Sequence, residues 1–75
     1  MLYRIEKHTD EKAFSRACDT IKKAFPSAKD KSAVDVDGSL VRVYETAKGE
    51  ISVHNDYEVG AVYAISELDL NDVLN

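Results

Sequence analysis

The spacing of apolar residues changes once along this chain, and that change limits the possible fold more than any other feature. Between residues 10 and 25 apolar side chains recur every three or four positions, which places them on one stripe of a helix. From residue 34 to residue 65 they recur at every second position, which is typical of half-buried antiparallel strands. The sequence therefore predicts an α+β fold in which one N-terminal amphipathic helix packs on an antiparallel sheet.

The helix is expected over residues 10–25. Thr9 or Asp10 can cap its first turn, because a side-chain oxygen there accepts hydrogen bonds from free backbone N–H groups. Pro26 disfavours helical geometry at the residue before it, so the helix should end at Phe25. The predicted apolar stripe consists of Phe14, Ala17, Cys18, Ile21, Ala24 and Phe25.

Strands are expected both before and after this helix in the sequence. Residues 2–6 form a short one, with Tyr3 and Ile5 on one side. Four more follow the helix, and a short terminal helix within residues 68–74 is compatible with the pattern. The order is therefore βαββββ, and 75 residues suffice for one domain spanning residues 1–75. The alternating apolar residues of the four later strands are Val34 and Val36, Val41 and Val43, Ile51 and Val53, and Val59, Ala61, Tyr63 and Ile65.

Turn residues suggest how these strands pair. A two-residue loop at residues 38–39 places glycine first, as a type II′ turn requires. Three-residue loops at 47–49 and 55–57 then keep one apolar face continuous through all the strands. The resulting pairs are Val36–Val41, Val34–Val43, Asp35–Arg42, Val43–Val53, Val53–Val59 and His54–Glu58.

In this register the helix covers the face that carries Val34, Val43 and Val53, and the opposite face is left bare. Apolar and tyrosine side chains surrounded by charges predict a protein-binding patch there. Other interpretations are scattered surface hydrophobes, a second copy of the chain, or cover by the C-terminal segment through Leu68, Leu70, Val73 and Leu74. The bare face is predicted to carry Leu2, Leu40, Tyr44, Val62 and Ala64, among Arg4, Asp35, Arg42, His54 and Glu58.

Charge is distributed unevenly along the chain, whose net charge is −4. The first 32 residues carry eight basic and five acidic side chains, whereas the rest carry two basic and nine acidic ones. Such an asymmetry attracts some partners and repels others. The C-terminal half is therefore either a dedicated docking surface or a solvated acidic face.

Together these features predict a small acidic protein-binding module, an inhibitor or regulator that docks on a larger protein. Small acidic proteins encoded by phages and mobile elements often act in this way, an analogy of size and charge only. In one form of this hypothesis the carboxylates imitate nucleic-acid charge. The predicted partner-binding residues are Leu40, Arg42, Tyr44, His54, Glu58, Val62, Glu67, Asp69 and Asp72.

The alternative function is a small nucleic-acid-binding regulator, acting as a monomer or a homodimer. It would use the basic side chains of the helix, Lys12, Arg16, Lys22 and Lys23. Direct nucleic-acid binding is not favoured, because a net charge of −4 and a pI near 5.0 lack the electrostatic footprint of such proteins.

The sequence does not predict an enzyme, a cofactor or a metal site. Cys18 falls on the apolar stripe of the helix, so we expect a core cysteine rather than a nucleophile. His8 and His54 add two further soft ligands, but the spacing of the three matches no zinc site. A single cysteine, no signal peptide and no apolar run of about 20 residues together favour a cytoplasmic protein without membrane contact.

Overall fold

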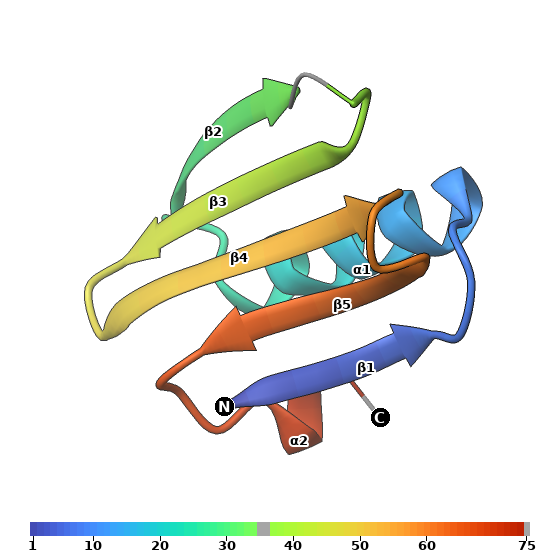
Figure 1. The fold of residues 1–75 in the computed structure, drawn as a ribbon. Coiled ribbons are helices and arrows are strands. Elements are labelled where there is room, and N and C mark those ends of the chain that lie inside the picture. The colour runs from blue at the N-terminus through green and yellow to red at the C-terminus, as the bar shows by residue number, and fades with distance from the viewer. Residues whose placement is uncertain (35–36, 75) are drawn as a thin grey trace.

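The computed structural model describes residues 1–34 and 37–74 and confirms the predicted fold class (Figure 1). Within these residues, five antiparallel strands form one sheet and helix α1 packs on one of its faces. Neither described helix is long and apolar enough to span a bilayer. In chain order the elements are β1 (Leu2–Glu6), α1 (Glu11–Ala24), β2 (Lys29–Val34), β3 (Leu40–Thr46), β4 (Gly49–Asp56), β5 (Ala61–Ser66) and α2 (Asn71–Leu74).

The strand order places the first two strands of the chain at opposite edges of the sheet. It runs β1-β5-β4-β3-β2, so the last four strands form a meander and β1 pairs with β5. Helix α1 connects the two edge strands and crosses one face of the sheet (Figure 1). The core therefore lies between α1 and this face.

Helix α1 begins and ends close to where the sequence predicts. The Oδ1 atom of Asp10 accepts the backbone N–H groups of Lys12 and Ala13, at 2.9 and 3.1 Å, which caps the first turn. At the other end Phe25 N–H donates to Ile21 O at 2.9 Å, and Pro26 follows. The stripe buried against the sheet consists of Ala13, Phe14, Ala17, Cys18 and Ile21.

Two polar contacts connect α1 to the middle of the sheet. Buried Tyr44 on β3 donates its hydroxyl to Cys18 O at 3.3 Å, and burial raises the pKa of this phenol, which keeps it protonated. On β4 the Oδ1 atom of buried Asn55 accepts Asp10 N–H at 3.1 Å, while Nδ2 has no partner among the described residues. The apolar residues that the sheet contributes to the core are Tyr44, Ile51, Val53, Val62 and Ala64.

The C-terminal segment packs on the same face as α1. The hydroxyl of Tyr3 on β1 donates to Leu68 O at 2.8 Å and accepts Leu70 N–H at 3.1 Å. Leu70 is fully buried in the core, and Val73 and Leu74 pack against it. The segment therefore does not cover the opposite face, which was one of the interpretations left open by the sequence.

The predicted pairing register is wrong at the described turns. Thr46 pairs with Gly49, so the turn between β3 and β4 has two residues rather than three, and Arg42 lies opposite Val53. The side chain of Thr46 favours this turn, because its Oγ1 accepts Gly49 N–H and donates to Gly49 O. One residue of slip moves every side chain of a strand to the other face.

The other two hairpins also differ from the predicted register, by three residues between β2 and β3 and by five between β4 and β5. Val34 lies opposite Leu40 rather than Val43, and the predicted pairs Val36–Val41 and Asp35–Arg42 involve residues outside the described ranges. Between β4 and β5 the turn comprises residues 57–60, so Val53 lies opposite Ala64 rather than Val59. Gly60 ends this turn with φ +77°, a left-handed conformation that glycine adopts without strain.

We predict that Tyr44→Phe lowers the free energy of unfolding by about 1 kcal/mol, because Cys18 O then lacks this hydrogen bond. Tyr44→Ala should cost about 3–5 kcal/mol, since a large aromatic side chain leaves the core. Urea denaturation measures both. Tyr57→Phe, at an exposed tyrosine, is the control and should stay within about 0.5 kcal/mol of the wild type. Equal stability of Tyr44→Phe and the wild type would contradict the role of the hydroxyl.

Candidate functional site: the uncovered face of the sheet

The register defines a second face, opposite α1, because residues directly paired across antiparallel strands point to the same side. Within the described residues both helices lie on the other face, so this one is open to solvent (Figure 1). We call it the open face. One row across it consists of Leu2, Ile65, Ser52, Val43 and Lys31, and the next of Arg4, Tyr63, His54 and Val41.

An aromatic stack occupies the centre of the open face. The rings of His54 and Tyr63 lie 4.7 Å apart between centroids and are nearly parallel, with an interplanar angle of 11°. The Nε2 atom of His54 is 2.9 Å from Ser52 Oγ, which donates to Ile65 O at 3.4 Å. The stacked rings are therefore held in place by neighbouring strands rather than by a covering layer.

Asp56 fixes the turn beside this stack. Its Oδ2 accepts the hydroxyl of Tyr63 at 2.7 Å, and its Oδ1 accepts the N–H groups of Glu58 and Val59 at 2.9 and 3.1 Å. These donors hold the pKa of Asp56 below its usual range, with the tyrosine hydroxyl as the largest cause. The turn consequently presents Val59, which is 67% exposed, at the border of the open face.

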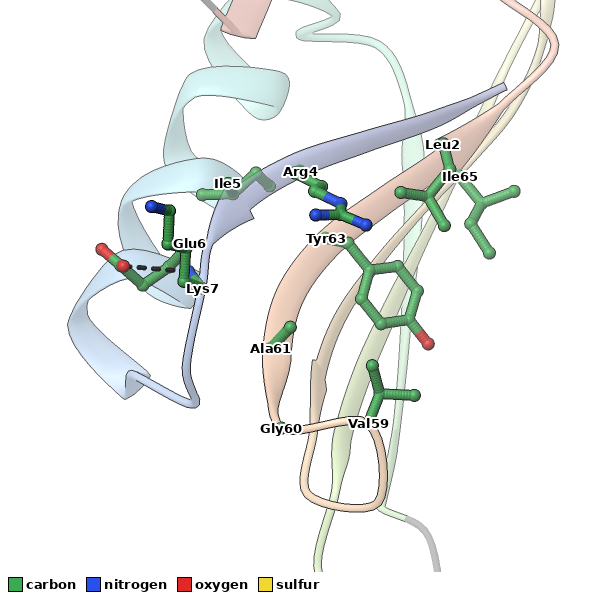
Figure 2. Close-up of a pocket in the computed structure, with 10 residues that line it drawn as sticks. All are labelled: Leu2, Arg4, Ile5, Glu6, Lys7, Val59, Gly60, Ala61, Tyr63 and Ile65. Atoms are coloured by element: carbon green, nitrogen blue, oxygen red, sulfur yellow. Dashed lines mark hydrogen bonds between the residues drawn. The ribbon is translucent and has the colours of Figure 1, made fainter.

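A groove of about 830 Å³ runs between β1 and this turn (Figure 2). The pairing of β1 with β5 shifts between Arg4 and Glu6, and beyond this irregularity the two strands diverge (Figure 2). Arg4 forms no ion pair with any described residue. The groove is lined by Leu2, Arg4, Ile5, Glu6, Lys7, Val59, Gly60, Ala61, Tyr63 and Ile65.

At the opposite edge of the open face, charged residues protect the edge strand β2. Lys31 on β2 forms an ion pair with Glu45 on β3, and this pairing raises the pKa of the lysine and lowers that of the glutamate. Both side chains are exposed, so the pair contributes little to stability. Its effect is to discourage strand addition at this edge, because an incoming strand would have to desolvate the charges.

Four of the predicted partner-binding residues lie on the α1 side instead of the open face. Tyr44 is 1% exposed and Val62 is 0% exposed, so neither contributes to the surface. Leu40 packs against the core, and half-buried Arg42 donates its Nε to Ser32 Oγ at 3.1 Å. Placing these residues on the bare face was wrong, because the turns between the strands differ from those predicted.

The other predicted residues are not brought together. His54 lies on the open face as expected, but Tyr63 and not Glu58 is opposite it. Glu58 is exposed in the turn, and the exposed acidic residues Glu67, Asp69 and Asp72 belong to the segment that packs beside α1. The open-face residues that the sequence analysis missed are Val41, Val43, Ser52, Val59, Tyr63 and Ile65. Gly60, as a turn-ending glycine, is the sequence signal that could have revealed the face on which Tyr63 and Ile65 of β5 lie.

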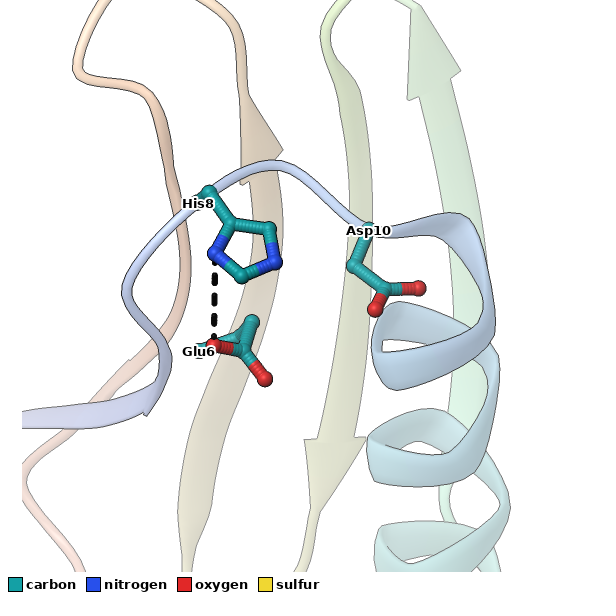
Figure 3. Close-up of side chains that lie close together, drawn as sticks. All are labelled: Glu6, His8 and Asp10. Atoms are coloured by element: carbon teal, nitrogen blue, oxygen red, sulfur yellow. Dashed lines mark ion pairs between the residues drawn. The ribbon is translucent and has the colours of Figure 1, made fainter.

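A second group of polar residues lies between β1 and α1 (Figure 3). Glu6, His8 and Asp10 each offer a metal-ligating atom within 4.8 Å of the others, and His8 Nδ1 is 3.5 Å from Glu6 Oε1. The same Glu6 oxygen, however, accepts Lys7 N–H at 2.9 Å, and Asp10 caps the helix. Hydrogen bonding to the backbone thus accounts for both carboxylates, and we assign the group to the turn that leads into α1.

The remaining reactive side chain is the thiol of Cys18. It is 2% exposed within the core, and burial raises its pKa, so it does not present a thiolate to a substrate. Cys18 and His54 lie on opposite sides of the sheet and cannot share a ligand. No family model, curated protein or solved structure matches this chain, so its function is inferred from these surfaces alone.

We predict that the protein loses stability in acid through Asp10 and Asp56. Hydrogen-bond donors hold the pKa of each carboxyl below the usual 3.8. The largest cause is Ala13 N–H for Asp10 and the Tyr63 hydroxyl for Asp56. A carboxylate whose pKa is lowered on folding stabilises the protein above its unfolded pKa, and this stabilisation disappears as the pH falls through the folded pKa. The free energy of unfolding, measured in urea at a series of pH values, should therefore decrease as the pH drops below 3.8.

The variants Asp56→Asn and Tyr63→Phe separate the contribution of Asp56 from that of Asp10. The first removes the titrating group, and the second removes the main donor that lowers its pKa. Both should show a weaker decrease in acid than the wild type. An unchanged acid dependence in both variants would contradict this assignment.

Proposed function

We propose that this protein is a protein-binding module that docks on a larger protein through the open face of its sheet. The observation that carries the proposal is the composition of that face. An antiparallel sheet with one solvated face normally alternates apolar residues inward with polar residues outward. Here outward positions on β1, β3 and β5 are apolar or aromatic instead, namely Leu2, Val41, Val43, Tyr63 and Ile65.

The border of this face also suits a protein interface. Arg4 lies on the edge strand β1, and Lys31 on the opposite edge strand β2 pairs with Glu45 on β3, so charged groups flank the apolar and aromatic centre. Protein interfaces commonly combine such an apolar centre with a polar rim. The acidic residues of the C-terminal half supply the net charge that steers a basic partner toward the molecule.

Rigidity favours binding by this face. The strands fix its backbone, and the contacts among His54, Tyr63 and Asp56 fix the central side chains. A surface that is already ordered loses little conformational entropy when a partner binds. A chain of 75 residues with such a surface can act by occupying a site on its partner, so we propose an inhibitor or regulator rather than a catalyst.

Features of α1 favour a protein partner over nucleic acid. Lys22 donates its Nζ to Ala28 O at 2.7 Å, so this cation serves the end of the helix. The other exposed charges of α1 have both signs, which gives no continuous basic surface for a phosphate backbone. They are Glu11, Lys12, Arg16, Asp19 and Lys23.

The test compares partners recovered by the immobilised wild type and by two variants that add the same charge on opposite faces. Ile65→Glu places a carboxylate on the open face, and Ala24→Glu places one at the exposed end of α1. We expect wild type and Ala24→Glu to recover the same protein from a lysate of the source cells. Ile65→Glu should bind it at least ~10-fold more weakly, because the charge would be buried in the interface.

Circular dichroism and thermal unfolding verify that both variants remain folded. If Ile65→Glu binds the recovered protein as tightly as the wild type does, the open face is not the docking surface. Recovery of no protein by the wild type would contradict the function as a whole.

A further inference from the structure

Apolar side chains converge on the groove beside β1. Leu2 and Ile65 are directly paired across β1 and β5, and they are 56% and 43% exposed. Val59 approaches from the turn on the other side, with Tyr63 between them (Figure 2). Three of the six large apolar residues that the described chain exposes thus line one groove. Such a concentration points to a ligand with apolar side chains of its own.

Arg4 gives the same groove a positive charge. Its guanidinium extends over the groove near Tyr63 (Figure 2). Glu6 is the one acidic side chain among the described residues that line the groove, and its Oε1 already accepts Lys7 N–H. The five donors of a guanidinium match the two oxygens of a carboxylate, so Arg4 is suited to an acidic group on the ligand.

The form of the groove favours a peptide segment over a small molecule. Leu2, Arg4, Lys7 and Val59 are all exposed, so a small ligand would keep much of its surface in water, unlike the ligands of enclosed sites. The described pairing of β1 with β5 ends at Glu6 and Val62, leaving Ala61 without a partner on that side. An extended segment can lie along the groove there and alternate its side chains toward and away from the sheet.

We infer that this groove binds an extended segment of the partner protein in which an aspartate or glutamate lies between apolar residues. Arg4 receives the carboxylate, and Leu2, Ile65 and Val59 contact the apolar side chains. The inference rests on the proposed function and narrows it to one part of the open face and one class of ligand.

The experiment selects ligands for the whole wild-type protein from a displayed library of random peptides of about 12 residues. We expect the enriched peptides to share an acidic residue flanked by apolar ones. Fluorescence polarisation with labelled synthetic copies then measures their affinity for the wild type and for Arg4→Glu, which should bind at least ~10-fold more weakly. Lys23→Glu makes the same charge change on α1 and should bind like the wild type.

A change in the peptide keeps the test independent of protein folding. Replacing its acidic residue by the corresponding amide should weaken binding to the wild type and abolish the difference between wild type and Arg4→Glu. Enriched peptides without an acidic residue, or equal binding by wild type and Arg4→Glu, would overturn the inference. The absence of any enriched peptide would also overturn it. So would sedimentation that shows the wild type to self-associate and the Arg4→Glu variant to be monomeric, because the occupant of the groove would then be a second copy of the chain.

These outcomes are distinct from failure of the proposed function. If Ile65→Glu no longer binds the recovered partner and Arg4→Glu still does, the open face remains the docking surface, and only the acidic segment is excluded as the ligand of the groove. Equal recovery of the partner by the wild type and all variants would exclude both the open face as the docking surface and the acidic segment as the ligand of the groove.

Discussion

Helix α1 connects the two edge strands of the sheet, and the rest of the structure depends on that connection. Strands β1 and β2 lie at opposite edges, and α1 is the element that joins them. Because every neighbouring pair of strands is antiparallel, β1 and β2 point the same way, so α1 has to carry the chain back along the strands before β2 can begin (Figure 1). A helix of 14 residues is about 21 Å long and a strand of six residues about 20 Å, so the length of the helix matches that of the strands. The same helix is therefore both the connection and the main cover of the core. One helix used in this way can cover only one face.

The two faces of the sheet are consequently stabilised by different means. On the α1 side, close packing of apolar residues dominates, and Tyr44 and Asn55 add polar contacts that fix the position of the helix. On the open side no described element supplies such packing. There Asp56 joins the turn at 57–60 to Tyr63, and Tyr63 stacks on His54. This network orders a surface that would otherwise consist of mobile side chains, and it does so without closing it to a partner.

The sequence was sufficient for the fold class and for α1, because both follow from the spacing of neighbouring residues. It was not sufficient for the register. In β5 both alternating sets are apolar, Val62 and Ala64 in one and Tyr63 and Ile65 in the other, so burial alone cannot choose between them. The choice depends on turn lengths, which are set by side-chain contacts such as those of Thr46. Positions on β1 and His54 on β4 were assigned to the correct face, whereas a slip in β3 and β5 inverted the rest of the candidate site.

The hydroxyl of Tyr3 joins residues that are 65 and 67 positions apart in the chain. The hairpins from β2 to β5 form between neighbouring segments, whereas β1 and the C-terminal segment meet only when almost the whole chain closes into a loop. Closing so long a loop costs conformational entropy before any contact compensates for it, which slows folding. We therefore expect the two ends of the chain to join late in folding. Because β1 forms one wall of the groove, the groove exists only while the two ends of the chain are joined.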